Sequence, residues 1–180
     1  MTETAPLTVD IFDNQQLIKI ADKNAKKKIE SAMKLVCKRI LADAGIGAGR
    51  VNIVLVDSPT MQQYNNRFLG HDYTTDVISF RLEYKEINSP SKQKKVCATL
   101  NRIGVGWYLD GDVYVCVDVA ELGSVEYGCG VLEELFLYVV HGVLHLVGYD
   151  DTTPKSKKIM QQKESEYIAT IDKKILRLCD

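Results

Sequence analysis

Residues 131–147 constrain the fold of this chain more than any other segment, because they are apolar on almost every side of a predicted helix. A helix without a polar face is stable in water only when other elements cover it. The run is shorter than the roughly 18 apolar residues that a membrane span requires. Gly148 follows directly and is expected to end the helix. We therefore expect a buried core helix around which the rest of the chain packs.

Two of the three histidines lie in this apolar helix. At four-residue spacing, His141 and His145 project from one helix face, where two imidazoles can hold one metal ion without bending the backbone. Asp150 and Asp151 follow Gly148, and a turn there can bring a carboxylate back toward both rings. Two nitrogens and one oxygen leave the fourth tetrahedral position open, as in catalytic zinc sites. His141, His145 and Asp151 are therefore the predicted ligands of one Zn²⁺.

Simpler interpretations of the histidine pair have to be weighed. Histidines at this spacing also arise by chance, and a buried histidine is more often a hydrogen-bonded core residue than a ligand. The longer pattern, with Gly148 and Asp151 after the pair, is more specific. It gathers polar groups where burial costs free energy unless a metal or a partner compensates. The five cysteines include no Cys-x-x-Cys pair, so they indicate neither a thiolate metal site nor a disulfide framework.

Hydrophobic periodicity along the rest of the chain predicts four strands and four helices. The strands are expected at residues 7–12, 51–56, 76–82 and 112–117, and the helices at 22–44, 58–69, 131–147 and 153–178. The pattern contains no repeat and no clear domain boundary. This order of elements predicts an α+β fold, with one domain over residues 1–180 and a mixed sheet of about four strands surrounded by helices.

Local signals place the ends of several elements. Asp22 is expected to cap the first helix, and Ser58, which precedes a proline, the second. Gly111 is expected to lead into the last strand. Residues 84–102 are polar and lysine-rich, and they are predicted to form a long loop or insertion.

The sequence around the histidine pair resembles the signature of the YbeY family, which reads HGxLHLxGYDH. Other segments agree with the family in order and spacing. They are residues 75–80, which resemble its TDVLSF strand, residues 111–115, which resemble its GDI strand, Glu134 with Leu135, and Met160 with Glu164. The resemblance covers residues 51–166, which is most of the chain.

Members of this family are zinc-dependent endoribonucleases of ribosomal RNA maturation. The resemblance therefore implies a YbeY-like domain with a zincin-like metal helix, which hydrolyses single-stranded RNA. It also implies action at the 3′ end of small-subunit ribosomal RNA and in ribosome quality control, with the small ribosomal subunit and its assembly factors as partners. A metal ion at such a site activates water near neutral pH and stabilises the charge that develops on an attacked phosphodiester.

Two positions depart from the family pattern. The usual third ligand is His, whereas Asp151 stands there, which keeps a zinc-compatible ligand set but leaves another divalent metal open. Leu69 stands where the family often has Arg, and Arg67 and His71 are nearby candidates for the missing charge. Asp150 is a candidate general base, although a substrate phosphate can take that part instead.

Two other functions remain open from the sequence. One is a zinc peptidase, but the helical peptidase motif carries Glu directly after the first His as its general base, whereas Gly142 stands there. The other is a ribosome-assembly factor that binds RNA and proteins around a structural metal without cutting. Structural zinc normally has four protein ligands, so coordination by His71 as a fourth ligand would favour that alternative.

The charge pattern and the N-terminus bear on partners and location. The net charge of −1 predicts that RNA binding comes from local lysine clusters rather than from bulk charge. Such clusters lie at residues 23–39, 92–95 and 155–163. Lys26, Lys27 and Lys28 are slightly favoured, because positive charge at the start of a helix is otherwise unfavourable beside the helix dipole. No signal peptide and no membrane span are recognised, so a cytoplasmic location is expected.

Overall fold

Three parallel strands and one antiparallel strand form the central sheet. The computed structural model describes residues 6–13, 22–87 and 106–178. The strands are β1 Thr8–Phe12, β2 Ile46–Val56, β3 Val77–Glu86 and β4 Trp107–Cys116. Their order is β1-β2-β4-β3, with β1, β2 and β4 parallel and β3 antiparallel to β4. This arrangement confirms the predicted α+β fold with a mixed four-stranded sheet.

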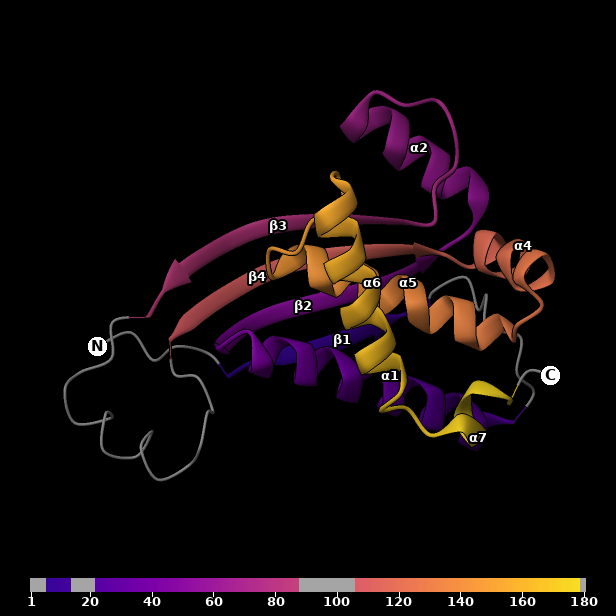
Figure 1. Ribbon diagram of the computed structural model, residues 1–180, viewed down its shortest axis with the longest axis horizontal. Helices are drawn as coiled ribbons and strands as arrows, with labels where there is room; N and C mark the ends of the chain where they lie inside the picture. Colours follow the sequence, from indigo (N-terminus) through magenta and orange to yellow (C-terminus); the bar gives the residue numbers. More distant parts are fainter. Residues whose placement is uncertain (1–5, 14–21, 88–105, 179–180) are drawn as a thin grey trace.

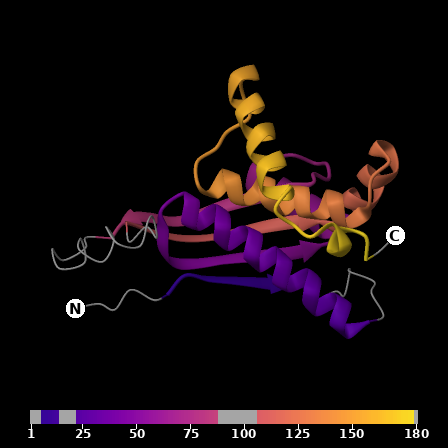
Figure 2. The ribbon, with the colours of Figure 1, turned by 60° about the horizontal axis from the view of Figure 1, so that its bottom comes forward.

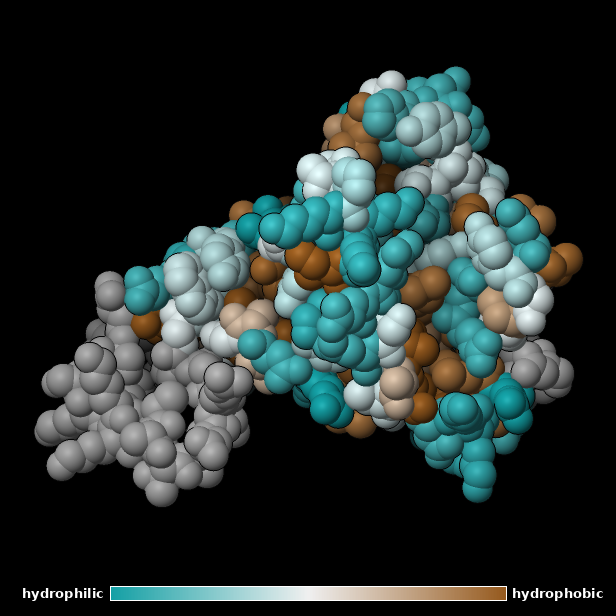
Figure 3. All heavy atoms as spheres, in the orientation of Figure 1, coloured by the Kyte–Doolittle hydropathy of each residue, from teal (hydrophilic) through white to brown (hydrophobic). Residues whose placement is uncertain are grey.

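The helices lie mainly on one face of this sheet (Figures 1 and 2). Their bounds are α1 Lys23–Asp43, α2 Ser58–Leu69, α4 Val117–Tyr127, α5 Val131–Leu146, α6 Pro154–Ile168 and α7 Lys173–Leu176. α1 and α5 pack directly on the strands, and α6 and α7 contact these two helices from outside. Polar side chains cover the outer side of α6 (Figure 3), which fits its charged sequence.

α5 is buried on nearly all sides, as its apolar sequence predicts. Its large side chains belong to one hydrophobic cluster with side chains of α1 and the sheet, including Leu135, Phe136, Val139, Val143, Leu144, Ile29, Met33, Ile53, Leu109 and Val113. Each fully buried side chain of this size stabilises the fold by about 1.5–3 kcal/mol. No single helix of the described residues is long and apolar enough to cross a membrane; only α4 and α5, bent by 119°, pass such a test as a pair.

The opposite face of the sheet carries a smaller cluster beneath α2. Met61 and Tyr64 of α2 pack there against Ile78, Phe80 and Tyr114 of the last two strands. The capping residue differs from the prediction. The carboxylate of Asp57 accepts from the amide of Thr60 at 3.0 Å, so Asp57 caps α2 and Ser58 is its first residue.

β2 and β4 begin earlier than predicted. Each contains a glycine that allows a close contact inside the sheet. β2 starts at Ile46, since Gly49 has a φ of +123° and an added Cβ would overlap the carbonyl oxygen of Leu109 on β4. Gly111 lies inside β4 rather than before it. An added Cβ there would lie 3.1 Å from Leu146, so this glycine makes room for the end of α5.

The predicted loop at residues 84–102 was wrong at its start. Tyr84, Lys85 and Glu86 belong to β3, and they pair with Leu109, Tyr108 and Trp107 of β4. A register shift between Arg81 and Glu83 precedes this extension. The ring of Tyr84 stacks on that of Trp107, with centroids 4.8 Å apart, and this contact holds the two strand ends together. The rest of the predicted loop, from residue 88 onward, lies outside the described residues.

Two helical features differ from the prediction. α4 was missed, because it has no side-chain cap and carries Gly123 in its interior, both of which weaken the sequence signal. The predicted final helix is broken. α6 ends at Ile168 and α7 starts after Asp172, whose carboxylate accepts from the amide of Lys174 at 2.9 Å.

Gly142 is the closest point of contact between α5 and the sheet. An added Cβ would lie 2.4 Å from Val113 and 2.8 Å from Val77, distances that real carbon atoms do not adopt. The hydroxyl of Ser79 donates to the carbonyl oxygen of Gly142 at 2.9 Å. This hydrogen bond fixes the position of α5 along β3.

Gly142→Ala is expected to destabilise the protein by about 1–3 kcal/mol, because the added methyl group forces α5 away from both strands. Chemical denaturation measures this loss. Gly106→Ala is the matched control, since an added Cβ there lies at an ordinary 3.7 Å from its nearest neighbour. Equal stability of the two variants would contradict the close packing at Gly142.

Candidate metal centre

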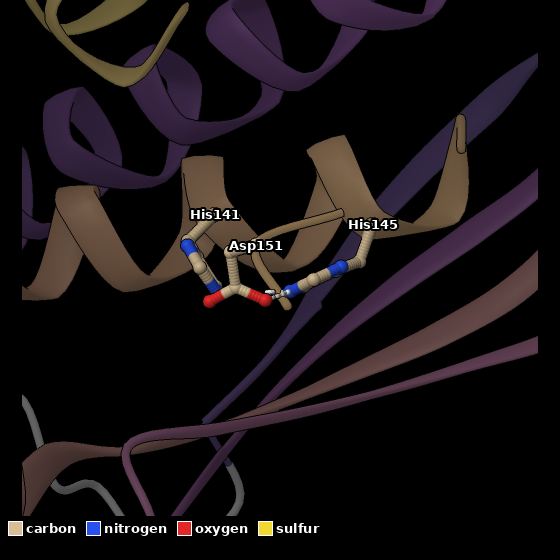
Figure 4. Close-up of side chains that lie close together, drawn as sticks. All are labelled: His141, His145 and Asp151. Atoms are coloured by element: carbon tan, nitrogen blue, oxygen red, sulfur yellow. Dashed lines mark hydrogen bonds and ion pairs between the residues drawn. The ribbon is translucent and has the colours of Figure 1, made fainter. Parts of the chain in front are cut away.

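The end of α5 and the turn that follows it bring three metal-binding side chains together. His141 and His145 lie on consecutive turns of α5. Gly148 adopts a φ of +101°, and the next amide, that of Tyr149, donates back to Leu144 at 3.0 Å. This tight turn reverses the chain and carries Asp151 toward both rings (Figure 4).

Both histidine rings are held by their Nδ1 atoms. Nδ1 of His141 donates to a carboxylate oxygen of Glu164 at 2.6 Å. Nδ1 of His145 donates to the backbone carbonyl oxygen of Tyr149 at 3.0 Å. Neither oxygen carries a proton to give, so both rings have their hydrogen on Nδ1. When the rings are neutral, their Nε2 atoms therefore have lone pairs directed into the site.

The two Nε2 atoms lie 2.9 Å apart. Two lone pairs at this distance repel each other unless a positive charge lies beside them. The carboxylate of Asp151 is 3.7 Å from Nε2 of His145 and 4.0 Å from Nε2 of His141. One ligand atom from each residue falls within 4.8 Å of the others, so His141, His145 and Asp151 could hold a metal ion. The donor set of two imidazoles and one carboxylate fits zinc or a related divalent ion.

The electrostatics of the cluster also favour a cation. Burial disfavours the charged form of His141, but the hydrogen bond to Glu164 and the negative charges of the neighbouring carboxylates outweigh it. As a result, the pKa of His141 is raised above its ordinary value. The same carboxylates stabilise a divalent ion, because it too brings positive charge to the site.

A pocket of about 190 Å³ opens beside the cluster, between α5, α6 and the start of β3. His141 and Asp151 line it together with Glu164. Asp76, which precedes β3, and Lys157, in the first turns of α6, also line it. The pocket thus combines two members of the three-residue cluster, two further carboxylates and a cationic side chain.

Gly142 decides against peptidase chemistry at this site. The helical peptidase motif needs a glutamate immediately after its first histidine. In this structure that position faces the sheet, where even one added carbon atom would overlap Val113 and Val77. A glutamate there has no room, and its carboxylate would point away from His141 and His145.

The remaining predicted site residues lie around the cluster rather than in it. The carboxylate of Asp150 is exposed and accepts from the hydroxyl and the amide of Thr152, at 2.5 and 3.3 Å. These hydrogen bonds lower the pKa of Asp150, so it is a weaker base than an ordinary aspartate. Its part as general base stays a prediction.

Arg67 and His71 stand at the end of α2 and just after it. The guanidinium of Arg67 lies over the ring of Phe68, and the imidazole of His71 stacks on Tyr73. Neither residue lines the pocket beside the metal cluster, and within the described ranges His71 is not part of the group that could hold the ion. Leu69, at the position of the family's arginine, is half exposed.

The structure brings four further residues to the cluster, of which sequence reasoning had given only Lys157 a role, as part of a lysine cluster that could bind RNA. Glu164 holds His141, and Asp76 and Lys157 line the pocket. The guanidinium of Arg81 donates to the carbonyl oxygen of His145 at 3.1 Å. Their polar identities were visible in the sequence, but only the packing of α6 and β3 beside α5 shows that they meet.

Comparison with known proteins supports this picture. Residues 10–172 match the family model described as Endoribonuclease YbeY. The chain is 42% identical to the endoribonuclease YbeY of Elusimicrobium minutum over 123 residues, which are 68% of this chain and 75% of that protein. It is 34% identical to the protein of the same name from Salinibacter ruber over 139 residues, which are 77% and 81% of the two chains.

A solved structure has a similar fold. The solution structure of TM1509 from Thermotoga maritima matches with a TM-score of 0.50 and 26% sequence identity. The match covers 89% of this chain and 87% of the other.

His145→Ala is expected to abolish tight metal binding, because it removes one of the three ligands that the described residues supply. The loss should exceed the roughly 10–100-fold that removal of an outer hydrogen-bond partner costs. Metal content after dialysis, measured by mass spectrometry, gives the result. His71→Ala is the matched control and should retain the metal; loss of metal in that variant would instead favour a closed structural site.

Glu164→Gln is expected to weaken metal binding by about 10–100-fold, because the amide holds the His141 ring less firmly and lacks the negative charge. Competition with a metal indicator dye measures the affinity. Glu166→Gln is the control on the same helix, since the side chain of Glu166 is exposed and pairs with Lys163 instead. Equal affinities in the two variants would show that Glu164 does not support the metal.

Proposed function

Because this chain belongs to the Endoribonuclease YbeY family and brings His141, His145 and Asp151 together, we propose that it hydrolyses phosphodiester bonds of single-stranded RNA with one divalent metal ion. The observation that carries the proposal is the convergence of the two Nε2 atoms, 2.9 Å apart, on the carboxylate of Asp151. With neutral rings, this arrangement offers two nitrogen lone pairs and a carboxylate oxygen to one cation. Zinc is the proposed ion, because two imidazoles and one carboxylate are a common zinc ligand set.

The three ligands leave room for chemistry at the ion. Three protein ligands would leave a fourth tetrahedral position for water or substrate, whereas a structural zinc site is closed by four protein ligands. When bound, the ion lowers the pKa of water near neutral pH and stabilises negative charge on the attacked phosphate. This geometry favours a hydrolase over an assembly factor that holds a structural metal.

The chain's own residues complete the site. Asp76 lies in the same pocket as His141, and its carboxylate is oriented by hydrogen bonds from the hydroxyl of Thr75 and the amide of Val77, each at 2.8 Å. We assign it the acceptance of a proton from the attacking water, in preference to Asp150, because Asp76 lines the pocket and Asp150 does not. Lys157 lines the pocket as well and is placed to bind a phosphate.

The position of Lys157 changes the expected RNA footprint. The sequence slightly favoured the cluster Lys26, Lys27 and Lys28 as the RNA-binding surface. In the structure, Lys26 forms an ion pair with Asp13 at 2.7 Å. Lys27 and Lys28 line a different pocket, between α1 and α7. The lysine cluster at the start of α6 is therefore the footprint that we propose, because its Lys157 lines the pocket beside the metal cluster.

The biological substrate follows from the family. We propose ribosomal RNA, with cleavage at the 3′ end of the small-subunit RNA and a part in ribosome quality control. The small ribosomal subunit and its assembly factors are the corresponding partners, and the cytoplasm is the corresponding location.

Purified protein loaded with zinc is expected to cleave single-stranded RNA internally and to stop when a chelator removes the metal. A labelled fragment of small-subunit ribosomal RNA, extended beyond its mature 3′ end, is the substrate, and gel electrophoresis locates the cuts. An unrelated single strand and a duplex of the same fragment are compared, and the single strands should be cut faster.

His145→Ala, purified in parallel, controls for contaminating nuclease and should be inactive. Cleavage that persists in this variant or after chelation would contradict the proposal. If the unrelated strand is cut at the same rate and at as many sites per length, the protein is a nuclease without specificity for ribosomal RNA. Hydrolysis of a casein substrate in place of RNA would favour the peptidase.

A further inference from the structure

A row of three stacked side chains runs from the metal centre along the last two strands. The guanidinium carbon of Arg81 lies 5.1 Å from the ring centroid of Tyr84. The ring of Tyr84 in turn stacks on Trp107, with centroids 4.8 Å apart and planes inclined by 10°. Tyr84 is 40% exposed and Trp107 is 36% exposed, and Arg81 is also exposed.

The strand register places this row on the same face of the sheet as the metal helix. Arg81 pairs with Gly111, and Tyr84 pairs with Leu109. Gly111 and Leu109 are both buried on the α5 side, where Leu146 packs close to Gly111. Side chains of one strand alternate between faces, so Trp107 lies on this side as well.

One end of the row touches the end of α5, which carries His145, and the turn that leads to Asp151. The guanidinium of Arg81 donates to the carbonyl oxygen of His145 at 3.1 Å, and an added Cβ on Gly148 would lie 3.6 Å from the same nitrogen. The other end extends past α5, since Trp107 lies four residues before Gly111 on β4, a distance of about 13 Å. Figure 1 shows β3 and β4 continuing beyond the end of α5 in this direction.

The row has the chemistry of a binding surface for unpaired nucleotides. Flat aromatic rings stack on bases of any kind, and arginine binds phosphate and stacks as well. Glu83, two residues from Arg81, pairs with Lys85 at 2.6 Å. Within the described ranges, the contacts of Arg81 are thus a carbonyl oxygen and a ring rather than a carboxylate.

We propose that Arg81, Tyr84 and Trp107 form a platform that binds single-stranded RNA on one side of the scissile phosphate. The proposal rests on the proposed function, because it takes the metal centre as the place of cleavage. A base of the strand stacks on the outer face of Trp107, Tyr84 supports this ring from its inner face, and Arg81 binds the phosphate between this base and the metal. A duplex does not fit, because its bases are already stacked on one another. The platform therefore gives the site its preference for single strands.

Trp107 is the one tryptophan of the chain and reports on the platform directly. The probe is a 2′-O-methyl oligouridylate of about ten nucleotides, added to the zinc-loaded protein and checked on a gel to be intact. Stacking of a base on Trp107 is expected to quench its fluorescence with a saturable dependence on oligonucleotide concentration. A duplex of the same length should quench much less. Absence of quenching at saturation, judged by anisotropy of a labelled oligonucleotide, would overturn the platform.

Substitutions measure the part of each side chain. Trp107→Ala is expected to weaken binding of the labelled oligonucleotide by roughly 5–100-fold, the range for loss of one stacked base. Tyr84→Ala should weaken it less, because it removes the ring that supports Trp107. Trp107→Phe should retain most of the affinity. Arg81→Gln should weaken binding and lower its salt dependence by about one phosphate contact. Unchanged affinity in all of these variants would overturn the proposal.

Matched controls separate the platform from general effects. Tyr127→Ala removes an aromatic ring that is 68% exposed on α4, and Arg50→Gln removes a charge on the opposite face of the sheet, where Arg50 pairs with Asp110. Both should bind the oligonucleotide as the unaltered protein does. Metal content and melting temperature are recorded for every variant. If Tyr84→Ala does not fold, the quenching of Trp107 fluorescence in the unaltered protein still tests the platform.

Cleavage of a single-stranded RNA is assayed alongside. If the unaltered protein binds and quenches but cuts no RNA, the platform stands and the proposed hydrolysis is wrong. If it cuts RNA while the variants bind and cut as it does, the hydrolysis stands and the platform is wrong.

Discussion

The contact of α5 with the sheet at Gly142 is the constraint on which the rest of the structure depends. Without a side chain at this position, the helix backbone settles directly on Val77 and Val113, and Ser79 fixes it along β3. In a helix with 3.6 residues per turn, residues 141 and 145 then point sideways, along the edge of β3 and toward α6. The direction of both imidazoles is thus set by a glycine that has no side chain to contact a metal or a substrate.

Much of the fold and of the centre could be predicted from the sequence, because these features have a local cause. The apolar periodicity of α5 identified a buried helix, and the spacing of His141 and His145 identified a shared face. The turn at Gly148 was also foreseeable, since a glycine ends the periodic segment and two aspartates follow it. These inferences needed no knowledge of which elements pack together.

The errors and omissions concern contacts between distant segments. Gly111 was expected to lead into a strand, although it lies inside the sheet and permits the close approach of Leu146. Tyr84 read as part of a loop, because its stacking partner Trp107 is far away in sequence. In the same way, Glu164 and Arg81 gained a relation to the histidines only when α6 and β3 were placed beside α5.

The hydrogen bond between His141 and Glu164 has a consequence for the folding equilibrium. α6 buries few of its side chains, mainly Met160 and Tyr167, so its attachment to the domain is weaker than that of α1. A ligand that binds only the assembled arrangement shifts the opening equilibrium of the parts that compose it. Because Glu164 orients one of the ligands, the detachment of α6 is thermodynamically linked to metal affinity. Amide hydrogen exchange along this helix therefore reports the metal concentration around the protein.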